Sequence, residues 1–408
     1  MKIRSLIIAF ALLFTSIHES SAAAKPIPGA KCSKANTSQI SGNKKFTCVL
    51  KNKKLVWNSG TTIKTEPVAE KSNSEVNKTS ITEFADLAKY VDLSAETAWK
   101  KTMEQINTNK TPIYQLEIII GPTTKPDTLN PLYSKYSTKD YLDMVARLYA
   151  STPPAHQTFI VYSNYNDREW MAQKLDQLCG DNPRCGSDFL RECDPVNKTC
   201  GSAFATTGTQ YKNGILAISS PETPWKIYTE NIGTTEVHEF THRIQHSQAT
   251  QSTAVRLNEV PRWFMEGEAN LNQLFLGGYY NNIGKYQTTD IKQVAPSFTY
   301  GEYQVNRKAQ IDMMKNSAND KEFFMDFLNS PNEVFWQSSP YSQKQTYFYG
   351  AMFVESLRAI KGPQAEMSLI SLVTNGKNYS DAFKEIYGID WEKAKIILAE
   401  AAAKKFAS

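Results

Sequence analysis

The chain has 408 residues, of which 41% are hydrophobic and 11% aromatic, so it can bury at least one large core and is long enough for two or three domains. Its formal net charge of +5 is a small excess for this length and includes no long basic run. Because no known nucleic-acid-binding motif accompanies it, the charge gives no case for nucleic acid as a partner.

Residues 1–24 have the organisation of a secretory signal peptide. Lys2 and Arg4 precede an apolar stretch at residues 6–14, and small residues at 21–24 offer a cleavage site. A membrane anchor is the alternative, but this stretch is too short to span a bilayer easily, and no later segment is long and apolar enough. We therefore expect a mature protein without a transmembrane segment that is secreted, either extracellular or in the cell envelope.

The six cysteines fall into two groups, first Cys32 with Cys48 and later a group of four, Cys179, Cys185, Cys193 and Cys200. An even number in an exported chain favours disulfide bonds. A structural zinc site is the alternative for the group of four, but its spacings differ from the paired spacings usual for such sites. The sequence leaves the three possible pairings of these four cysteines open.

Residues 25–60 are rich in Lys, Gly and Ser and contain two short predicted strands, at residues 46–50 and 54–57. So small a segment buries little apolar area, and a Cys32–Cys48 bridge would supply the missing constraint. The segment resembles a two-cysteine module found near the N-termini of exported bacterial proteins. The module has no implied activity, but it could tether the protein to a cell wall, the cell envelope or a partner. Residues 61–80 are polar and are interpreted as a linker.

The main domain is predicted to cover residues 81–278, with a cysteine-rich insertion at 179–200. Its hydrophobic patterns predict alternating strands and helices, which is typical of an α+β domain with a modest sheet. The strand at 214–219 is a candidate edge strand to which an extended peptide could add. Residues 279–408 are expected to form a mainly helical C-terminal subdomain. The predicted strands are 114–120, 158–162 and 214–219, and the predicted helices are 141–149 and 167–178.

Residues 238–242 read HEFTH, a match to H-E-x-x-H. His238 and His242 are four residues apart and therefore lie on one side of a helix, where both imidazoles can reach one zinc ion. Glu239 would stand beside the metal, close enough to take a proton from water bound there. The alternative is a helix that carries histidine by chance, but three of the five histidines of the chain fall within nine positions.

A second segment, VPRWFMEGEAN at residues 260–270, supplies a carboxylate for the same site. Pro261 suits the start of a helix, and the glycines at 277 and 278 suit its end. Glu266 lies 24 residues after His242, far enough for a loop to bring a second helix alongside the first. A carboxylate there completes a His₂Glu ligand set and leaves a fourth position for water.

HEFTHRIQH followed by PRWFMEGEA resembles the gluzincin metallopeptidases, in particular the group with H-E-x-x-H and then W-x-x-E-G-x-A. The resemblance covers about residues 214–387. It implies a zincin-like domain, with a small twisted sheet above the HExxH helix and a helical subdomain closing the cleft. It also implies Zn²⁺ held by His238, His242 and Glu266, and Glu239 as general base. The expected substrate is a peptide or protein. Tyr347 in YFYG best matches the family's Y-x-x-G segment, whose tyrosine faces the oxyanion, and Tyr349 is the alternative.

Four further residues compete for roles at this site. His246 lies too far along the helix to share the ion with His238, and Glu268 points away from the Glu266 face, whereas Glu259 is the second choice as carboxylate ligand. Asn270, four residues after Glu266, either orients a ligand histidine or is a plain surface residue. Two other functions remain alternatives: a cell-envelope binding protein on a zincin scaffold, and a zinc hydrolase that acts on other substrates than peptides.

Overall fold

The computed structural model describes residues 27–35, 37–41, 44–62, 79–124, 138–152, 157–180, 184–200, 203–207, 213–220, 234–250, 252–277, 299–315, 319–330 and 341–407. The predicted signal peptide and nearly all of the predicted linker lie outside these ranges. Contacts divide the chain into two units, residues 1–76 and 77–408. The chain combines helices with small sheets, which is compatible with the predicted α+β class. Among the described helices, none combines the length and apolarity that a membrane span requires.

The first unit is a small antiparallel sheet. Strand β2 is its centre and pairs with each of the other three strands, and the predicted strands at 46–50 and 54–57 are both present within it. The Cys32–Cys48 disulfide is formed, with Cys48 fully buried. Strand β4 pairs with the start of β2 and lies within residues 61–80, the segment interpreted as a linker. The strands are β1 (Ser38–Ser41), β2 (Lys44–Lys51), β3 (Lys54–Trp57) and β4 (Thr61–Thr62).

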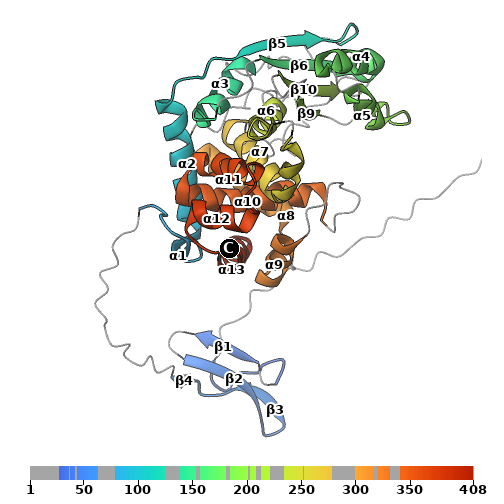
Figure 1. The fold of residues 1–408 in the computed structure, drawn as a ribbon. Coiled ribbons are helices and arrows are strands. Elements are labelled where there is room, and N and C mark those ends of the chain that lie inside the picture. Colours follow the sequence, from blue (N-terminus) through green and yellow to red (C-terminus); the bar gives the residue numbers. More distant parts are fainter. Residues whose placement is uncertain are drawn as a thin grey trace, which may run out of the picture. The chain divides into compact units, whose positions relative to one another are not determined.

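The second unit contains a four-stranded sheet in the order β5-β6-β10-β9 (Figure 1). Strands β5, β6 and β10 are parallel, and β9 is antiparallel to β10 at the edge. Residues Ile215 and Ala217 on β10 are therefore buried inside the sheet, with 0% and 1% exposure. The prediction that residues 214–219 form the edge strand is wrong, because β9 covers that side. The strands are β5 (Gln115–Ile120), β6 (Gln157–Asn164), β9 (Ala203–Thr207) and β10 (Asn213–Ser220).

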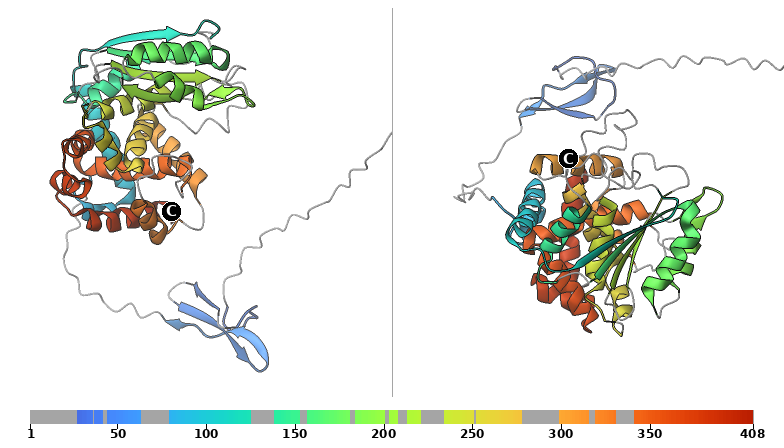
Figure 2. Two further views of the ribbon diagram at one scale, coloured as in Figure 1. Left: turned by 45° about the vertical axis from the view of Figure 1, so that its right-hand side comes forward. Right: turned by 90° about the horizontal axis from the view of Figure 1, so that it is seen from above.

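Alternating residues of β6 and β10 point to opposite faces of this sheet, and each face has its own hydrophobic cluster. Ile160 and Leu216 pack with helices α3 (Thr138–Leu148) and α6 (Thr234–His246). Val161 and Ile215 pack on the other face with α4 (Arg168–Cys179) and α5 (Cys185–Arg191), which Figure 2 shows beside the sheet. Two local disulfides, Cys179–Cys185 and Cys193–Cys200, hold this outer layer and settle the pairing that the sequence left open. The second of them joins the short strands β7 (Cys193–Asp194) and β8 (Thr199–Cys200).

The remaining helices form a bundle on the far side of α6 from the sheet (Figure 1). One hydrophobic cluster runs from the sheet through α6 into this bundle, and both belong to the same unit, residues 77–408. The bundle also includes α2, from the N-terminal end of the unit, which packs on α10. Its helices are α1 (Phe84–Leu87), α2 (Val91–Thr108), α7 (Arg262–Gly277), α8 (Tyr300–Met314), α9 (Lys321–Asn329), α10 (Gln343–Lys361), α11 (Pro363–Thr374), α12 (Tyr379–Tyr387) and α13 (Trp391–Ala407).

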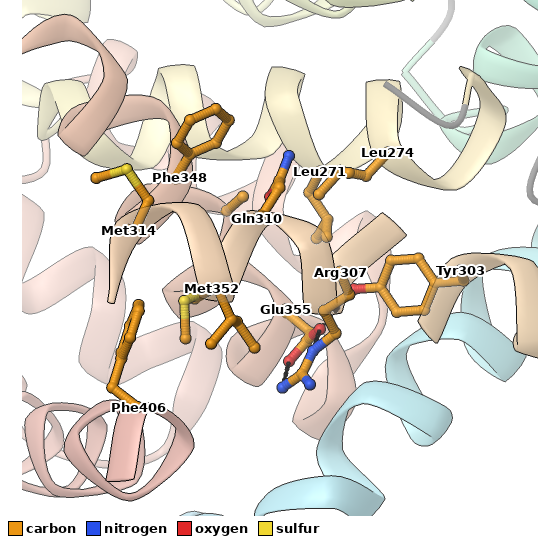
Figure 3. Close-up of a pocket in the computed structure, with 12 residues that line it drawn as sticks. Leu271, Leu274, Tyr303, Arg307, Gln310, Met314, Phe348, Met352, Glu355 and Phe406 are labelled. Carbon is orange, nitrogen blue, oxygen red and sulfur yellow. Dashed lines mark hydrogen bonds and ion pairs between the residues drawn. The ribbon is translucent and has the colours of Figure 1, made fainter. Parts of the chain in front are cut away.

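A buried ion cluster ties three helices of the bundle together. The Glu355 carboxylate on α10 accepts hydrogen bonds from Arg307 Nε on α8 (2.7 Å) and from Lys405 Nζ on α13 (2.8 Å). Burial alone would raise the pKa of the Glu355 carboxyl, but these two cations lower it to about 2. Figure 3 shows Arg307 and Glu355 facing each other beside a small cavity lined mostly by apolar side chains. The paired charges therefore brace α10, the helix that carries Tyr347.

Helices α7 and α10 approach each other through two glycines. A Cβ atom added to Gly267 would lie 2.2 Å from the carbonyl carbon of Gly350, and one added to Gly350 would lie 2.2 Å from the carbonyl oxygen of Trp263. Any side chain at either position would therefore push the two backbones apart. Because Gly267 follows Glu266 directly and Gly350 is three residues after Tyr347, this contact sets the distance between those two side chains.

We expect Gly267→Ala and Gly350→Ala each to lower the free energy of unfolding by about 1–3 kcal/mol, because the added methyl group overpacks the helix contact. Gly301→Ala is the matched control: it lies in α8, and a Cβ there meets no atom within 4 Å. The control should raise the free energy of unfolding by about 0.5–1 kcal/mol. Equilibrium denaturation measures all three variants, and wild-type stability at positions 267 and 350 would contradict the close contact.

Candidate metal centre

Helix α6 presents the two motif histidines because its opposite face is anchored in the core. Val237, Phe240 and Ile244 are all completely buried. Next to them, the Tyr162 hydroxyl of β6 donates a hydrogen bond of 2.6 Å to the carboxylate of Glu236. This combination of apolar packing and a buried polar link fixes the rotation of α6 under the sheet, so its other face turns toward α7.

His238, His242 and Glu266 converge on one point. Glu266 Oε2 is 3.3 Å from His238 Nε2 and 3.2 Å from His242 Nε2, and the two Nε2 atoms are 3.1 Å apart. In a tetrahedral zinc site with bonds of about 2.0–2.1 Å, neighbouring ligand atoms are roughly 3.3 Å apart. The three atoms therefore fit the edges of one face of such a site. Among the described residues, this is the group of three that could hold a metal ion.

Charge at the centre favours a cation. Burial alone would lower the pKa of His242, but the Glu266 carboxylate, with a contribution from the Glu239 charge, raises it to about 9. Burial alone would raise the pKa of Glu266, but the two histidines lower it well below its usual value. In the metal-free protein, a proton on His242 therefore balances Glu266 at neutral pH. A metal ion must displace this proton, so metal affinity should fall as the pH falls below about 9.

Gln245 controls which nitrogen of His242 faces the centre. Its Nε2 donates to the backbone carbonyl of Met265 at 2.9 Å, and a carbonyl only accepts, so the orientation of the amide is fixed. The amide oxygen Oε1 then lies 2.7 Å from His242 Nδ1, which must donate. With its proton on Nδ1, the neutral imidazole leaves the Nε2 lone pair for a metal. A helical i, i+3 spacing from a ligand histidine is the sequence signal that could have identified Gln245.

Behind Gln245 lies a buried polar network. Gln245 Nε2 also donates to Glu268 at 2.9 Å, and the Glu268 side chain is completely buried. Burial, and then the nearby charge of Glu366, raise the pKa of Glu268 well above its usual value. Arg358 pairs with Glu366 at 2.5 Å and donates to Asn272 at 2.8 Å. Glu268 therefore holds Gln245 in place and is not one of the three convergent residues. This agrees with the prediction that Glu268 points away from the face of the helix that carries Glu266.

We expect Gln245→Leu to weaken zinc binding by about 10–100-fold, because His242 loses the partner that orients its ring. Gln248→Leu is the matched control, since Gln248 bonds to Ile244 and Ser247 and to neither ligand histidine. Competition with a chromogenic chelator measures both affinities. Equal affinities for the two variants would show that Gln245 does not orient the ligand.

The structure places Glu239 and Tyr347 beside the three convergent residues. Glu239 is buried, with 7% exposure, and its negative charge contributes to the raised pKa of His242. The ring of Tyr347 lies 5.2 Å from the ring of His238, between centroids. Tyr349 points elsewhere: it is completely buried, and its hydroxyl accepts a hydrogen bond from Asn319 Nδ2 at 2.9 Å. Of the two candidate tyrosines, only Tyr347 is in reach of the centre.

Three other residues considered for this site, Glu259, His246 and Asn270, lie outside the group of three convergent residues. Glu259 is 44% exposed and pairs with Arg256, outside the group of three. The His246 ring stacks on His242 at 6.4 Å, and burial, then the His242 and Arg243 charges, lower its pKa to about 3. Asn270 is completely buried, so the interpretation as a surface residue is wrong. Its Nδ2 donates to the Tyr347 carbonyl at 3.3 Å, which links α7 to α10.

Arg262 is a site residue that sequence reasoning missed. It precedes Glu266 by one helical turn, and its Nε lies 4.0 Å from Glu266 Oε1. Burial lowers the pKa of this guanidinium, while the Glu266 charge opposes that shift. Its position four residues before Glu266 is the sequence signal that could have identified Arg262. Arg262 places positive charge next to Glu266 and within electrostatic reach of Tyr347.

Comparison of the chain with protein-family models, with curated proteins and with solved structures gave no match. Function is therefore inferred from the site itself.

Proposed function

We propose that the protein is a secreted zinc-dependent hydrolase of the gluzincin type, a peptidase that cleaves peptide bonds in peptide or protein substrates. The observation that carries this proposal is the convergence of two imidazole nitrogens and one carboxylate oxygen at tetrahedral spacing. Glu239, the residue after His238, is buried and adds negative charge at His242. A His₂Glu set with an open position is the arrangement of catalytic zinc sites. The Nδ1–H tautomer imposed by Gln245 supports the same assignment.

Zinc held by His238, His242 and Glu266 would supply a Lewis acid for the substrate carbonyl and lower the pKa of water. Glu239 accepts the proton of that water during attack on the carbonyl and returns it to the leaving amine, as a general base and then a general acid. Tyr347 donates a hydrogen bond to the oxygen that becomes negative in the transition state. Gln245 keeps His242 in the orientation that this chemistry requires.

The cysteines and the N-terminus support a compartment outside the cytoplasm. All six cysteines are paired in three disulfides, which persist in oxidising environments outside the cytoplasm. Residues 1–24 have the sequence pattern of a secretory signal. An exported peptidase meets protein substrates outside the cell, and the disulfides of its outer layer stabilise it there.

We expect Glu239→Gln to keep bound zinc and to lower kcat for a quenched-fluorescent peptide by about 10²–10⁴-fold, because the general base is lost. Glu259→Gln is the matched control, since Glu259 is an exposed carboxylate outside the group of three. Zinc content and peptide hydrolysis are measured on the mature protein from residue 25. If Glu239→Gln still turned over at the wild-type rate, the assignment of the base would be wrong; zinc without hydrolysis in the wild type would overturn the peptidase proposal.

A further inference from the structure

The N-terminal unit carries charge of one sign. Residues 25–60 contain eight lysines and no Asp, Glu, Arg or His. Residues 25–408 have a formal charge of +4, and the segment has +8, so the rest of the mature chain has −4. The small net charge of the whole chain is therefore the sum of a basic N-terminal segment and a net acidic remainder. Such an asymmetry is typical of a basic segment that binds an anionic surface or polymer.

Three of these lysines gather at one hairpin tip. Lys51 and Lys54 are directly opposite each other on β2 and β3, and Lys53 lies in the two-residue turn between them. All three side chains are exposed. Like charges directly opposite each other destabilise a sheet, so this arrangement contributes nothing favourable to folding. It does create a concentrated positive potential at a point that a partner can reach.

An apolar side chain lies next to this charge. Leu50 is the residue before Lys51 and is 69% exposed, and its cross-strand neighbour Leu55 is only partly buried. The two aromatic residues of the segment offer little surface for stacking on nucleic-acid bases, because Phe46 is 6% exposed and Trp57 is partly covered. An exposed leucine flanked by lysines fits the boundary between phosphate headgroups and acyl chains.

We propose that the tip of the β2–β3 hairpin docks the protein on a membrane surface rich in anionic lipid. Lys51, Lys53 and Lys54 contact the lipid phosphates, and Leu50 enters the layer just beneath them. Lysine side chains are long enough to keep their ammonium groups at the headgroups while their stems lie along apolar surface. The catalytic unit, with its net negative charge, is then held near the surface through a part of the chain that contains none of the metal ligands.

The test is co-sedimentation of the mature protein, residues 25–408, with vesicles of phosphatidylcholine alone or mixed with phosphatidylglycerol. The triple variant Lys51→Gln, Lys53→Gln, Lys54→Gln should partition into the mixed vesicles roughly a hundredfold less than the wild type, since each lysine near the surface contributes about 1 kcal/mol. The matched control removes three exposed lysines of the second unit, Lys110→Gln, Lys315→Gln and Lys344→Gln, for the same change in charge. The control should bind like the wild type.

Two further arms separate lipid from other anions. Binding should disappear at about 1 M salt, where the Debye length falls to roughly 3 Å, and Leu50→Asn should weaken vesicle binding but not retention on inorganic polyphosphate. Equal binding to neutral vesicles, or an equal loss in both triple variants, would overturn the proposal. A third outcome would also overturn the proposal: the Leu50→Asn variant binds vesicles as well as the wild type does, and the protein is retained more tightly on polyphosphate or duplex DNA than on vesicles. This result would show that the hairpin tip binds a soluble polyanion.

Discussion

The backbones of α7 and α10 touch at Gly267 and Gly350, and this contact sets how closely Tyr347 approaches the candidate metal centre. Helix α7 packs against both α6 and α10. A helix pair with ordinary side chains at the crossing would stand several ångströms further apart. Glycine at both positions has no side chain, so the two helices can approach more closely than that. Tyr347 on α10 therefore lies alongside His238, next to the point where Glu266 meets the histidines of α6.

The W-x-x-E-G segment therefore has a physical explanation in this chain. Trp263 is almost completely buried and packs on Phe353 and Trp391, which anchors the first turn of α7 against α10 and α13. Glu266 follows on the side that faces α6, and Gly267 permits the close approach to α10. The motif thus combines an anchor, a ligand and a contact point within five residues. Its value for recognising a site comes from this coupling of packing with chemistry.

Much of the site could be predicted from the sequence because helical spacing determines which residues share a face. His238 and His242 four residues apart, and Glu266 on a following helix, needed only that periodicity. The residues that support them were harder to find. Gln245 and Asn270 act through contacts with Met265 and Tyr347, and such contacts depend on how α6, α7 and α10 pack together. Their helical spacing from a candidate ligand marks such amides for attention, but it does not distinguish a structural partner from a surface residue.

Parts of the fold were less predictable for a related reason. The strand at 214–219 was correctly located, but its place in the sheet depends on β9, whose short segment follows the cysteine-rich insertion. Hydrophobic alternation shows that a strand is buried, yet it does not identify the strand's neighbours. The local disulfides Cys179–Cys185 and Cys193–Cys200 and the packing of α2 on α10 likewise follow from three-dimensional contacts.

A calorimetric zinc titration of the metal-free mature protein near pH 7, in buffers with different heats of ionisation, is the decisive experiment on the metal centre. We expect one zinc per chain and release of about one proton, because the pKa of His242 in the metal-free centre is about 9. His242→Ala should abolish this binding. Absence of zinc binding by the wild type, or unchanged binding by His242→Ala, would show that His238, His242 and Glu266 do not form a metal centre.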